Sequence, residues 1–528
     1  MFRRLRRIPR VVVLASATFA VLLGFWSFLN PVFGPPDEMA HADVVFHLAT
    51  GADYPEYDER IVGPAAFSLF LTHSMVIQYD AATGTSEAGE RTLTSAEDVD
   101  FSARFDELGG DESADNWPNQ IPQHPPLYYW SSSMGLRAMR VVHGGPLSMD
   151  HEVHLLRFLN VLLLAPMPVL AWATARRLGA PDPVATTAAL FPLAIPQLAH
   201  VGASINNDNL FVALCSALAL VLASVLRGDH RARTAVAAGA LAGLAMLSKG
   251  LGVVLPFWIV ACYATPVLRH RDHLRAATRS ALIAVGTMVA VGSWFSLRNL
   301  LVHGTPSPSL HAATTAPDTF SPDLVAWLAH FPVHLTKGFW GYFGYYEIQI
   351  GTAATLLGTI LAGTTVASAL LGRPRRVGSS TGIGRLELAA LLTVIPMLVA
   401  FVGLVGWDLY TKTAALRNFV QGRYLFGAVI PLAVGTAVGA MRLFGRWAGA
   451  VVLGVALMLQ TQSIRLALDR SWGTAGDSLA TSYRVVAAWN PWPVPLVHLS
   501  AAASVVLFAA LAFEVVRRTR QPIVGPPT

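Results

Sequence analysis

Long apolar stretches separated by short polar ones run along most of the chain. A bilayer core about 30 Å thick needs roughly 20 apolar residues for each helical crossing. On this pattern we predict twelve transmembrane helices, some of them cut shorter than a full crossing. Their ranges are 11–29, 155–173, 184–198, 210–226, 234–247, 251–267, 281–295, 348–371, 386–407, 424–440, 448–464 and 494–516.

Composition agrees with this pattern. Apolar residues make up 53% of the 528 residues and charged residues only 13%, which excludes an ordinary soluble enzyme. The predicted fold class is therefore an all-α polytopic membrane protein with about twelve transmembrane helices. The first helix occupies residues 11–29, and the other eleven form a helix bundle within residues 154–516.

Arginines predict which end of the helices faces the cytoplasm, because short loops rich in Lys and Arg stay on that side. Residues 1–10 form a basic N-terminus with five arginines, and the tail 517–528 contains three more. Every second loop between the helices is also basic, as at Arg176 and Arg177. We therefore expect both termini on the cytoplasmic side of a bacterial cytoplasmic membrane.

The segment 30–153 differs in kind from the other loops. It holds 20 of the 32 acidic residues, five arginines and no lysine, which predicts a large extracytoplasmic loop. Within it, residues 125–142 are apolar, but Arg137 and Arg140 would fall inside a membrane span. We interpret this stretch as an interfacial helix. The net charge of +6 averages basic inner loops with this acidic loop, so it indicates no nucleic-acid partner.

Two adjacent carboxylates, Asp37 and Glu38, follow the first predicted helix by a few residues. Lipid excludes carboxylates, so an acidic pair at a membrane surface is a candidate functional site. The alternative is that they only cap the helix that begins after Pro36, since carboxylates favour helix N-termini. Both readings stay open at the level of sequence.

Positive charge gathers on the same predicted side of the membrane. All three lysines lie there, although the loop rule favours the opposite side. A phosphate is the simplest ligand for such charge, and the alternative is that these side chains are interfacial anchors. The candidate phosphate ligands are Lys249, Arg298, Arg417 and Arg423.

Several motifs together resemble a known group of enzymes. They are the acidic motif at Asp37, the run 124–129, Leu156–Arg157, the run 243–250, Arg298–Asn299 followed by the run 303–306, the aromatic box 339–344 and the run 421–425. In their order and their common side of the membrane they resemble the GT-C superfamily of integral-membrane glycosyltransferases, and within it the bacterial domain of unknown function 2142. The resemblance extends from about Val11 to Tyr424.

The resemblance implies a sugar transferase that uses a polyprenyl-phosphate sugar donor. The acceptor would be an envelope glycan or lipid on the outer face of the membrane. Such a reaction needs a base for the acceptor hydroxyl and positive charge for the phosphate, which leaves as an anion without a general acid. Asp37 is the expected base. Glu38 is the second catalytic candidate, although adjacent helical residues point about 100° apart.

Other residues are expected to complete the site. Aromatic rings near it could stack on a sugar, although an aromatic belt at the membrane interface explains them equally well. Glu38 and His41 share a helical face, which leaves a divalent cation, Mg²⁺ or Mn²⁺, as an open option. The candidate sugar-binding or acceptor-binding residues are His124, Tyr128, Trp340, Tyr342 and Gln421.

Two other classes of protein fit the same features. A non-catalytic translocator or flippase of lipid-linked sugars would share the helices and the basic outer face, but would need no base at Asp37. An envelope scaffold would need neither the basic outer face nor a base at Asp37. Within the enzyme class, a glycan polymerase or ligase is a further alternative to a transferase of single sugars.

Overall fold

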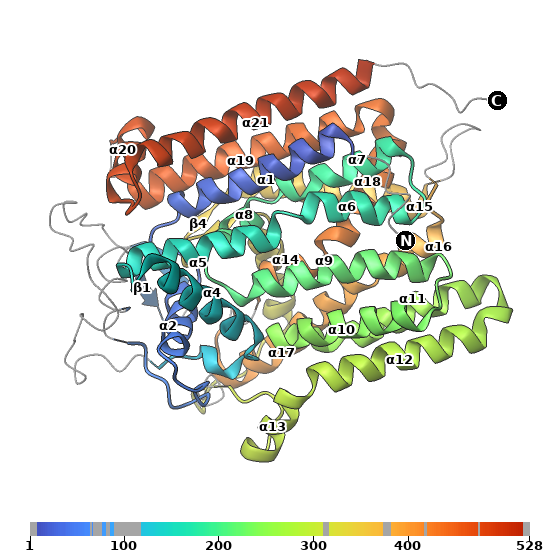
Figure 1. Ribbon diagram of the computed structural model, residues 1–528, viewed down its shortest axis with the longest axis horizontal. Helices are drawn as coiled ribbons and strands as arrows, with labels where there is room; N and C mark the ends of the chain where they lie inside the picture. Colours follow the sequence, from blue (N-terminus) through green and yellow to red (C-terminus); the bar gives the residue numbers. More distant parts are fainter. Residues whose placement is uncertain are drawn as a thin grey trace.

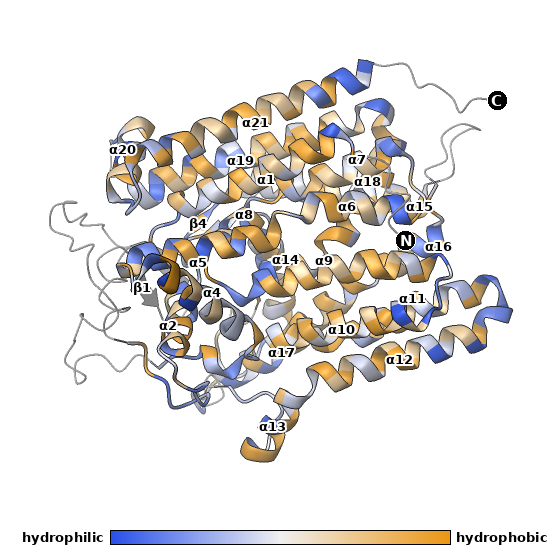
Figure 2. Cartoon of the chain, viewed as in Figure 1, coloured by the Kyte–Doolittle hydropathy of each residue, from blue (hydrophilic) through white to orange (hydrophobic). Residues whose placement is uncertain are grey.

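The computed structural model is almost wholly α-helical, as predicted (Figure 1). It describes residues 8–63, 66, 77–80, 85–88, 118–309, 316–372, 382–416, 420–473 and 476–520. Hydrophobic residues make up most of the outer helices α12 (Leu274–Gly292) and α21 (Val494–Arg520), and hydrophilic residues gather at the end of each that lies toward the right of the view (Figure 2). This distribution is the one that a lipid bilayer requires of helices that cross it.

Nine helical segments in these described ranges are long and apolar enough to cross a membrane, or ten if one bent pair counts as a span. The count of twelve is therefore unconfirmed. The α-helices are α1 (Arg10–Leu29), α2 (Glu38–Ala49), α4 (Leu127–His143), α5 (Met149–Leu164), α6 (Met167–Arg177), α7 (Asp182–Leu190), α8 (Pro196–Gly202), α9 (Asn207–Leu226), α10 (Ala232–Ser248), α11 (Leu255–Arg269), α12 (Leu274–Gly292), α13 (Trp294–His303), α14 (Leu324–Trp340), α15 (Thr352–Leu371), α16 (Arg385–Leu392), α17 (Val394–Thr413), α18 (Val429–Phe444), α19 (Ala448–Trp472), α20 (Leu479–Trp489) and α21 (Val494–Arg520).

The predicted helices differ from the structure where proline or glycine interrupts them. The stretch 184–198 is split into α7 and α8, which meet at 66°, because Ile195 takes the extended conformation favoured before Pro196. The stretch 348–371 begins too early. Residues 348–349 form a strand, and α15 starts only after Gly351, whose φ is +85°. Helix α14, which contains Pro332, was not predicted.

Close packing of the bundle depends on small residues at two helix contacts. A Cβ on Gly239 of α10 would lie 2.1 Å from the carbonyl oxygen of Ala284 on α12. A Cβ on Gly243 would lie 2.9 Å from the carbonyl oxygen of Met288 on the same helix. The two backbones therefore approach closely only because these positions lack side chains.

The segment after α1 folds against one end of the bundle, on the left of Figure 1, and both chain ends lie toward the right. Its helices α2 and α4 enclose a small apolar core of their own around Phe33, Phe46, Tyr128 and Tyr129. A short 3₁₀ helix, η3 (Ile121–Gln123), precedes α4. The helix expected over 125–142 is confirmed as α4.

Two small hairpins complete the fold. Strands β1 (Ile77–Asp80) and β2 (Thr85–Ala88) pair antiparallel, as do β3 (Tyr342–Phe343) and β4 (Ile348–Gln349). The turn of the second hairpin, residues 344–347, brings Tyr345 to the carboxylate of Asp37. The 3₁₀ helix η8 (Gly422–Ala428), which leads into α18, contributes Arg423 to the same place.

Candidate functional site

Asp37 is held in an unusual backbone conformation at the start of α2. Its φ is +62°, in the left-handed region that non-glycine residues rarely adopt. Although Asp37 occupies the N-cap position, its side chain makes no capping bond within the described structure. The carboxylate instead accepts hydrogen bonds from Arg423 at 2.6 Å and from Gln120 and Tyr345, each at 3.3 Å. Capping alone, one of the two sequence readings, is therefore wrong.

Four charged side chains form a continuous chain of ion pairs, which we call the ion-pair chain: Asp37, Arg423, Asp208 and Lys249. Arg423 donates from Nη2 to Asp37, and its Nε lies 3.4 Å from Oδ2 of Asp208. The other oxygen of Asp208 accepts a hydrogen bond from Lys249. Carboxylates and cations alternate along this chain, so its formal charge sums to zero.

Three helix ends bring the ion-pair chain together. Asp208 lies in the first turn of α9, where the side chain of Asn206 accepts a hydrogen bond from its backbone N–H. Lys249 directly follows the last residue of α10, the helix that packs against α9. Arg423 enters through Gly422, where a Cβ would lie 2.0 Å from the backbone nitrogen of Phe339. Only glycine permits η8 to approach α14 so closely.

Burial distinguishes the members of the ion-pair chain. The side chain of Lys249 is 7% exposed, that of Arg423 4% and that of Asp208 1%, whereas that of Asp37 is 16% exposed. Both cations are buried and paired with carboxylates, whereas an interfacial anchor extends an exposed charged end toward lipid headgroups. Asp37 is the carboxylate that solvent or a ligand reaches first.

Neighbouring charges keep Asp37 ionised. Burial raises its pKa, but the neighbouring positive charges, chiefly that of Arg423, outweigh that effect and hold the pKa at about 2. Burial, together with the charge of Lys249, lowers the pKa of His124 to about 4. The pKa of His41 lies well below its ordinary value, chiefly because the ring is buried. At neutral pH both histidines are neutral beside an ionised Asp37.

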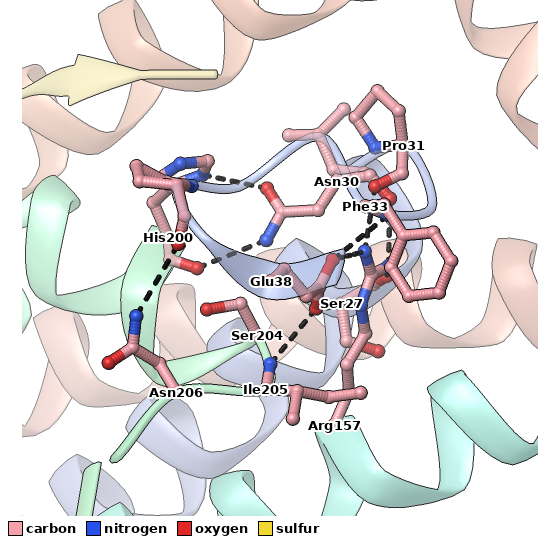
Figure 3. Close-up of polar contacts among 12 residues, drawn as sticks. Ser27, Asn30, Pro31, Phe33, Glu38, Arg157, His200, Ser204, Ile205 and Asn206 are labelled. Atoms are coloured by element: carbon pink, nitrogen blue, oxygen red, sulfur yellow. Dashed lines mark hydrogen bonds and ion pairs between the residues drawn. The ribbon is translucent and has the colours of Figure 1, made fainter. Parts of the chain in front are cut away.

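Glu38 is fully buried, and its carboxylate lies against Arg157, Phe33 and Ile205 (Figure 3). Arg157 donates to both of its oxygens, at 2.8 and 2.6 Å. The backbone nitrogens of Phe33 and Ile205 donate to the same carboxylate, at 3.0 and 2.9 Å. A carboxylate with this burial and these four donors does not reach a substrate, so the expected catalytic role of Glu38 is not supported.

The Glu38–Arg157 pair instead fixes the loop that carries Asp37. Arg157 also donates to the carbonyl oxygens of Ser27, Asn30 and Pro31, at the end of α1. Asn30 in turn bonds His200 through both side-chain and backbone atoms, as Figure 3 shows. Glu38 therefore acts on Asp37 by holding the backbone immediately before it.

Comparison with known families now decides the affiliation. The family model described as "Predicted membrane protein (DUF2142)" matches residues 19–435. The chain belongs to this family. The resemblance predicted from the motifs is thereby confirmed, while no curated protein sequence matches the chain.

Solved structures similar to this DUF2142 protein are distant from it in sequence. ArnT from Cupriavidus metallidurans bound to undecaprenyl phosphate is 16% identical, with a TM-score of 0.45 over 96% of this chain and 78% of that one. Its apo state is 15% identical, with a TM-score of 0.46 over 96% and 77% of the two chains. The Archaeoglobus fulgidus oligosaccharyltransferase in complex with Zn and sulfate is 14% identical, with a TM-score of 0.42 over 89% and 54%.

Two of the four expected phosphate ligands of the DUF2142 protein, Lys249 and Arg423, meet in the ion-pair chain. Arg298 does not join them, because both ends of its guanidinium pair with Glu56. A single site shared by Asp37, Lys249, Arg298 and Arg423 is therefore not what the structure contains. Arg417 lies outside the described residues.

The expected sugar-binding residues separate in the same way. His124 lies near the ion-pair chain, whose charges act on its ring. Gln421 immediately precedes η8, and its Oε1 is buried without a hydrogen-bond partner among the described atoms. The other three are buried and bonded within the protein. Tyr128 bonds Asn160, Trp340 donates to Thr359, and Tyr342 accepts from Gln349.

The metal option at Glu38 and His41 finds no support in the donor set. Both oxygens of Glu38 are engaged by Arg157, and Nδ1 of His41 lies 2.9 Å from the hydroxyl of Tyr129. Across the parts of the chain that are described, no group of three or more His, Cys, Asp or Glu side chains is placed to hold a metal ion.

Asp208 and Tyr345 are the main site residues of the DUF2142 protein that were not selected from the sequence. A signal for Asp208 was present, because it begins one apolar helix and Lys249 follows the next. Consecutive antiparallel helices place such positions at the same end of the bundle. Tyr345 gave no such signal, since it lies one residue beyond the aromatic box 339–344 in a short hairpin turn.

Proposed function

We propose that this protein transfers a sugar from a polyprenyl-phosphate carrier to a hydroxyl group of an envelope glycan or lipid, at the outer face of the cytoplasmic membrane. The observation that carries the proposal is the ion-pair chain. It holds two buried cations beside an accessible carboxylate, at one end of a bundle of apolar helices. Transfer from a lipid phosphate needs these two kinds of group together.

Donor binding is proposed to exchange partners within the ion-pair chain. Arg423 and Lys249 are fully compensated by Asp37 and Asp208, so an incoming phosphate must replace one carboxylate. Asp37 is the more exposed of the two, and Asp208 is held by both cations. The phosphate oxygens would therefore take the hydrogen bond that Arg423 gives to Asp37, while Asp208 stays and orients the cations.

This exchange would convert Asp37 into a base. In the free protein Arg423 is the main cause of its low pKa, so losing that bond to the phosphate raises the proton affinity of the carboxylate. Gln120 and Tyr345 still hold it in place. The carboxylate is then both oriented and basic enough to accept a proton from an acceptor hydroxyl.

The proposed reaction is a single displacement at the anomeric carbon of the donor. Asp37 takes the proton of the acceptor hydroxyl while its oxygen forms the new bond to the anomeric carbon. The bond from that carbon to the phosphate oxygen breaks, and its electron pair leaves with the polyprenyl phosphate. Arg423 and Lys249 stabilise the resulting anion, so no proton has to be given to the leaving group.

Reconstitution of the full-length protein in nanodiscs tests this function. Synthetic polyprenyl-phosphate sugars are supplied with a panel of glycan and lipid acceptors, and mass spectrometry follows free polyprenyl phosphate and glycosylated acceptor. The proposal predicts equal amounts of both products. A parallel assay with chelator, and then with added Mg²⁺ or Mn²⁺, tests for a metal requirement.

The translocator alternative has a different signature. In proteoliposomes, a flippase would move the labelled lipid-linked sugar from one leaflet to the other without releasing polyprenyl phosphate. That result would overturn the proposed transfer reaction. A polymerase or ligase would instead release the carrier but accept a donor that bears a whole glycan, which the same mass measurement distinguishes.

A further inference from the structure

A pocket lined by aromatic residues and by Arg298 contains no member of the ion-pair chain. Its volume is about 140 Å³. The loop after α2, the start of α4 and helix α13 form its walls. In Figure 1, α13 lies below the end of α12. The residues that matter for the argument are Tyr54, Glu56, Trp130, Trp294, Arg298 and His303.

Two tryptophans form an accessible flat surface in this pocket. The rings of Trp130 and Trp294 stack with centroids 5.9 Å apart and an angle of 5° between their planes. Their residues are 41% and 40% exposed, so this surface is not part of the apolar core. Tyr54 meets Trp130 edge to face. Such rings offer contact to the C–H face of a sugar ring as well as to aliphatic groups.

On the polar side of the pocket, Arg298 and Glu56 form an ion pair in which each charge neutralises the other. Arg298 donates from both terminal nitrogens to Glu56, and Nε2 of His303 lies 3.1 Å from the same carboxylate. An anionic group would have to approach Glu56 or displace it. A neutral polyol can instead accept from the guanidinium and donate to the carboxylate without breaking the pair.

Tyr54 connects this pocket to the candidate active site. Its hydroxyl donates a 2.8 Å hydrogen bond to the carbonyl oxygen of His124. The charges of the ion-pair chain shift the pKa of the His124 ring. Its ring lies 6.0 Å from that of Tyr129, which bonds His41 beside Asp37. Tyr54 therefore joins the pocket, through Tyr129 and His124, to the residues that surround Asp37.

We infer that the pocket of Tyr54, Glu56, Trp130, Trp294, Arg298 and His303 binds a neutral sugar unit of the acceptor, and that Arg298 is not a donor-phosphate ligand. The inference rests on the proposed function and adds to it the chemical class of the acceptor group. The aromatic surface binds the ring, and the Glu56–Arg298 pair binds its hydroxyl groups. The donor phosphate occupies the separate ion-pair chain.

Kinetics with Glu56→Gln and Trp294→Leu test the inference, with Glu59→Gln as a matched control because Glu59 is exposed on the same loop. Both pocket variants should raise the KM for the acceptor by about tenfold or more, while the KM for the donor and the behaviour of the control stay as in the wild type. A rise in donor KM, or no change in either KM, would overturn the inference.

A binding measurement keeps the inference testable if no transfer is detected. The nanodisc-embedded protein is titrated with neutral methyl glycosides and with glucose 6-phosphate, and tryptophan fluorescence is followed. Saturable quenching by a neutral glycoside that is lost in Trp294→Leu would support the pocket even if the proposed reaction fails. Preferential binding of glucose 6-phosphate, or no saturable binding, would contradict it.

Discussion

Arg423 donates a 2.6 Å hydrogen bond to the carboxylate of Asp37, a residue 386 positions earlier in the chain. Its Nε lies 3.4 Å from Oδ2 of Asp208. One guanidinium therefore joins the loop after α1 to the first turn of α9, and of its two carboxylate partners Asp208 is the more deeply buried. This geometry makes Arg423 the residue through which a phosphate would change the state of Asp37.

Arg423→Lys tests the role of the guanidinium. Lysine keeps the charge but has a single ammonium nitrogen. It therefore lacks the planar set of N–H donors with which Arg423 can contact Asp37, Asp208 and a phosphate. Loss of one charge-assisted hydrogen bond should weaken binding of undecaprenyl phosphate by roughly 10- to 100-fold. Isothermal calorimetry in nanodiscs measures this.

The matched control for that variant is Arg446→Lys. Arg446 lies in the 3₁₀ helix η9 (Gly445–Trp447), away from the ion-pair chain, and its contact is with the ring of Trp447. Undecaprenyl phosphate affinity should be unchanged there. Wild-type affinity in Arg423→Lys would show that the phosphate binds elsewhere.

The pH dependence of transfer should differ between the free protein and its donor complex. A carboxylate base works only when ionised, so activity falls as the pH drops through its pKa. With the pKa of Asp37 at about 2 in the free protein, kcat/KM should show no loss from this group down to about pH 4. In the complex the pKa rises, so the acid limb of kcat should lie at higher pH. Coincident acid limbs would contradict the proposed exchange of partners.

The Glu38–Arg157 pair should contribute to stability rather than to the chemical step. Glu38→Ala leaves a fully buried guanidinium without its carboxylate, which costs about 3–5 kcal/mol. The double variant Glu38→Leu with Arg157→Met should lose less unfolding free energy than the sum of the losses in Glu38→Leu alone and Arg157→Met alone. Thermal unfolding in detergent, followed by tryptophan fluorescence, measures each. A purely additive result would show that the pair is not coupled.

Most of the fold could be predicted because membrane crossing imposes a simple pattern. Long apolar runs such as 11–29 and 494–516 coincide with helices α1 and α21. Helix α14 was missed because its sequence is interrupted by Pro332 and by three basic side chains. These are His330, His334 and Lys337, and they reduce the hydropathy of the stretch. Helix breaks at Ile195 and Gly351 depend on local backbone geometry, which hydropathy does not report.

The candidate site could be predicted only in part, for a physical reason. Asp37 was selected because a carboxylate is unusual at a membrane surface. Lys249 and Arg423 were selected because they lie on the same predicted side of the membrane, where positive charge suits a phosphate. Which residues they pair with depends on how helices that are far apart in sequence pack. The same packing pairs Glu38 with Arg157, 119 positions away, and so removes Glu38 from the site. The sequence made both adjacent acids catalytic candidates, with Asp37 as the expected base, whereas the start of α2 directs them to different environments.

Asp37→Asn tests the central claim most directly. Asparagine tolerates the left-handed conformation at this position better than alanine and keeps the shape of the side chain, so folding should be preserved. We predict that undecaprenyl phosphate still binds while sugar transfer falls by about 10²–10⁴-fold, the range for loss of a general base. Asp53→Asn, which changes an exposed acid on the loop after α2, should behave as the wild type. Transfer at the wild-type rate by Asp37→Asn would contradict the assignment of Asp37 as the base.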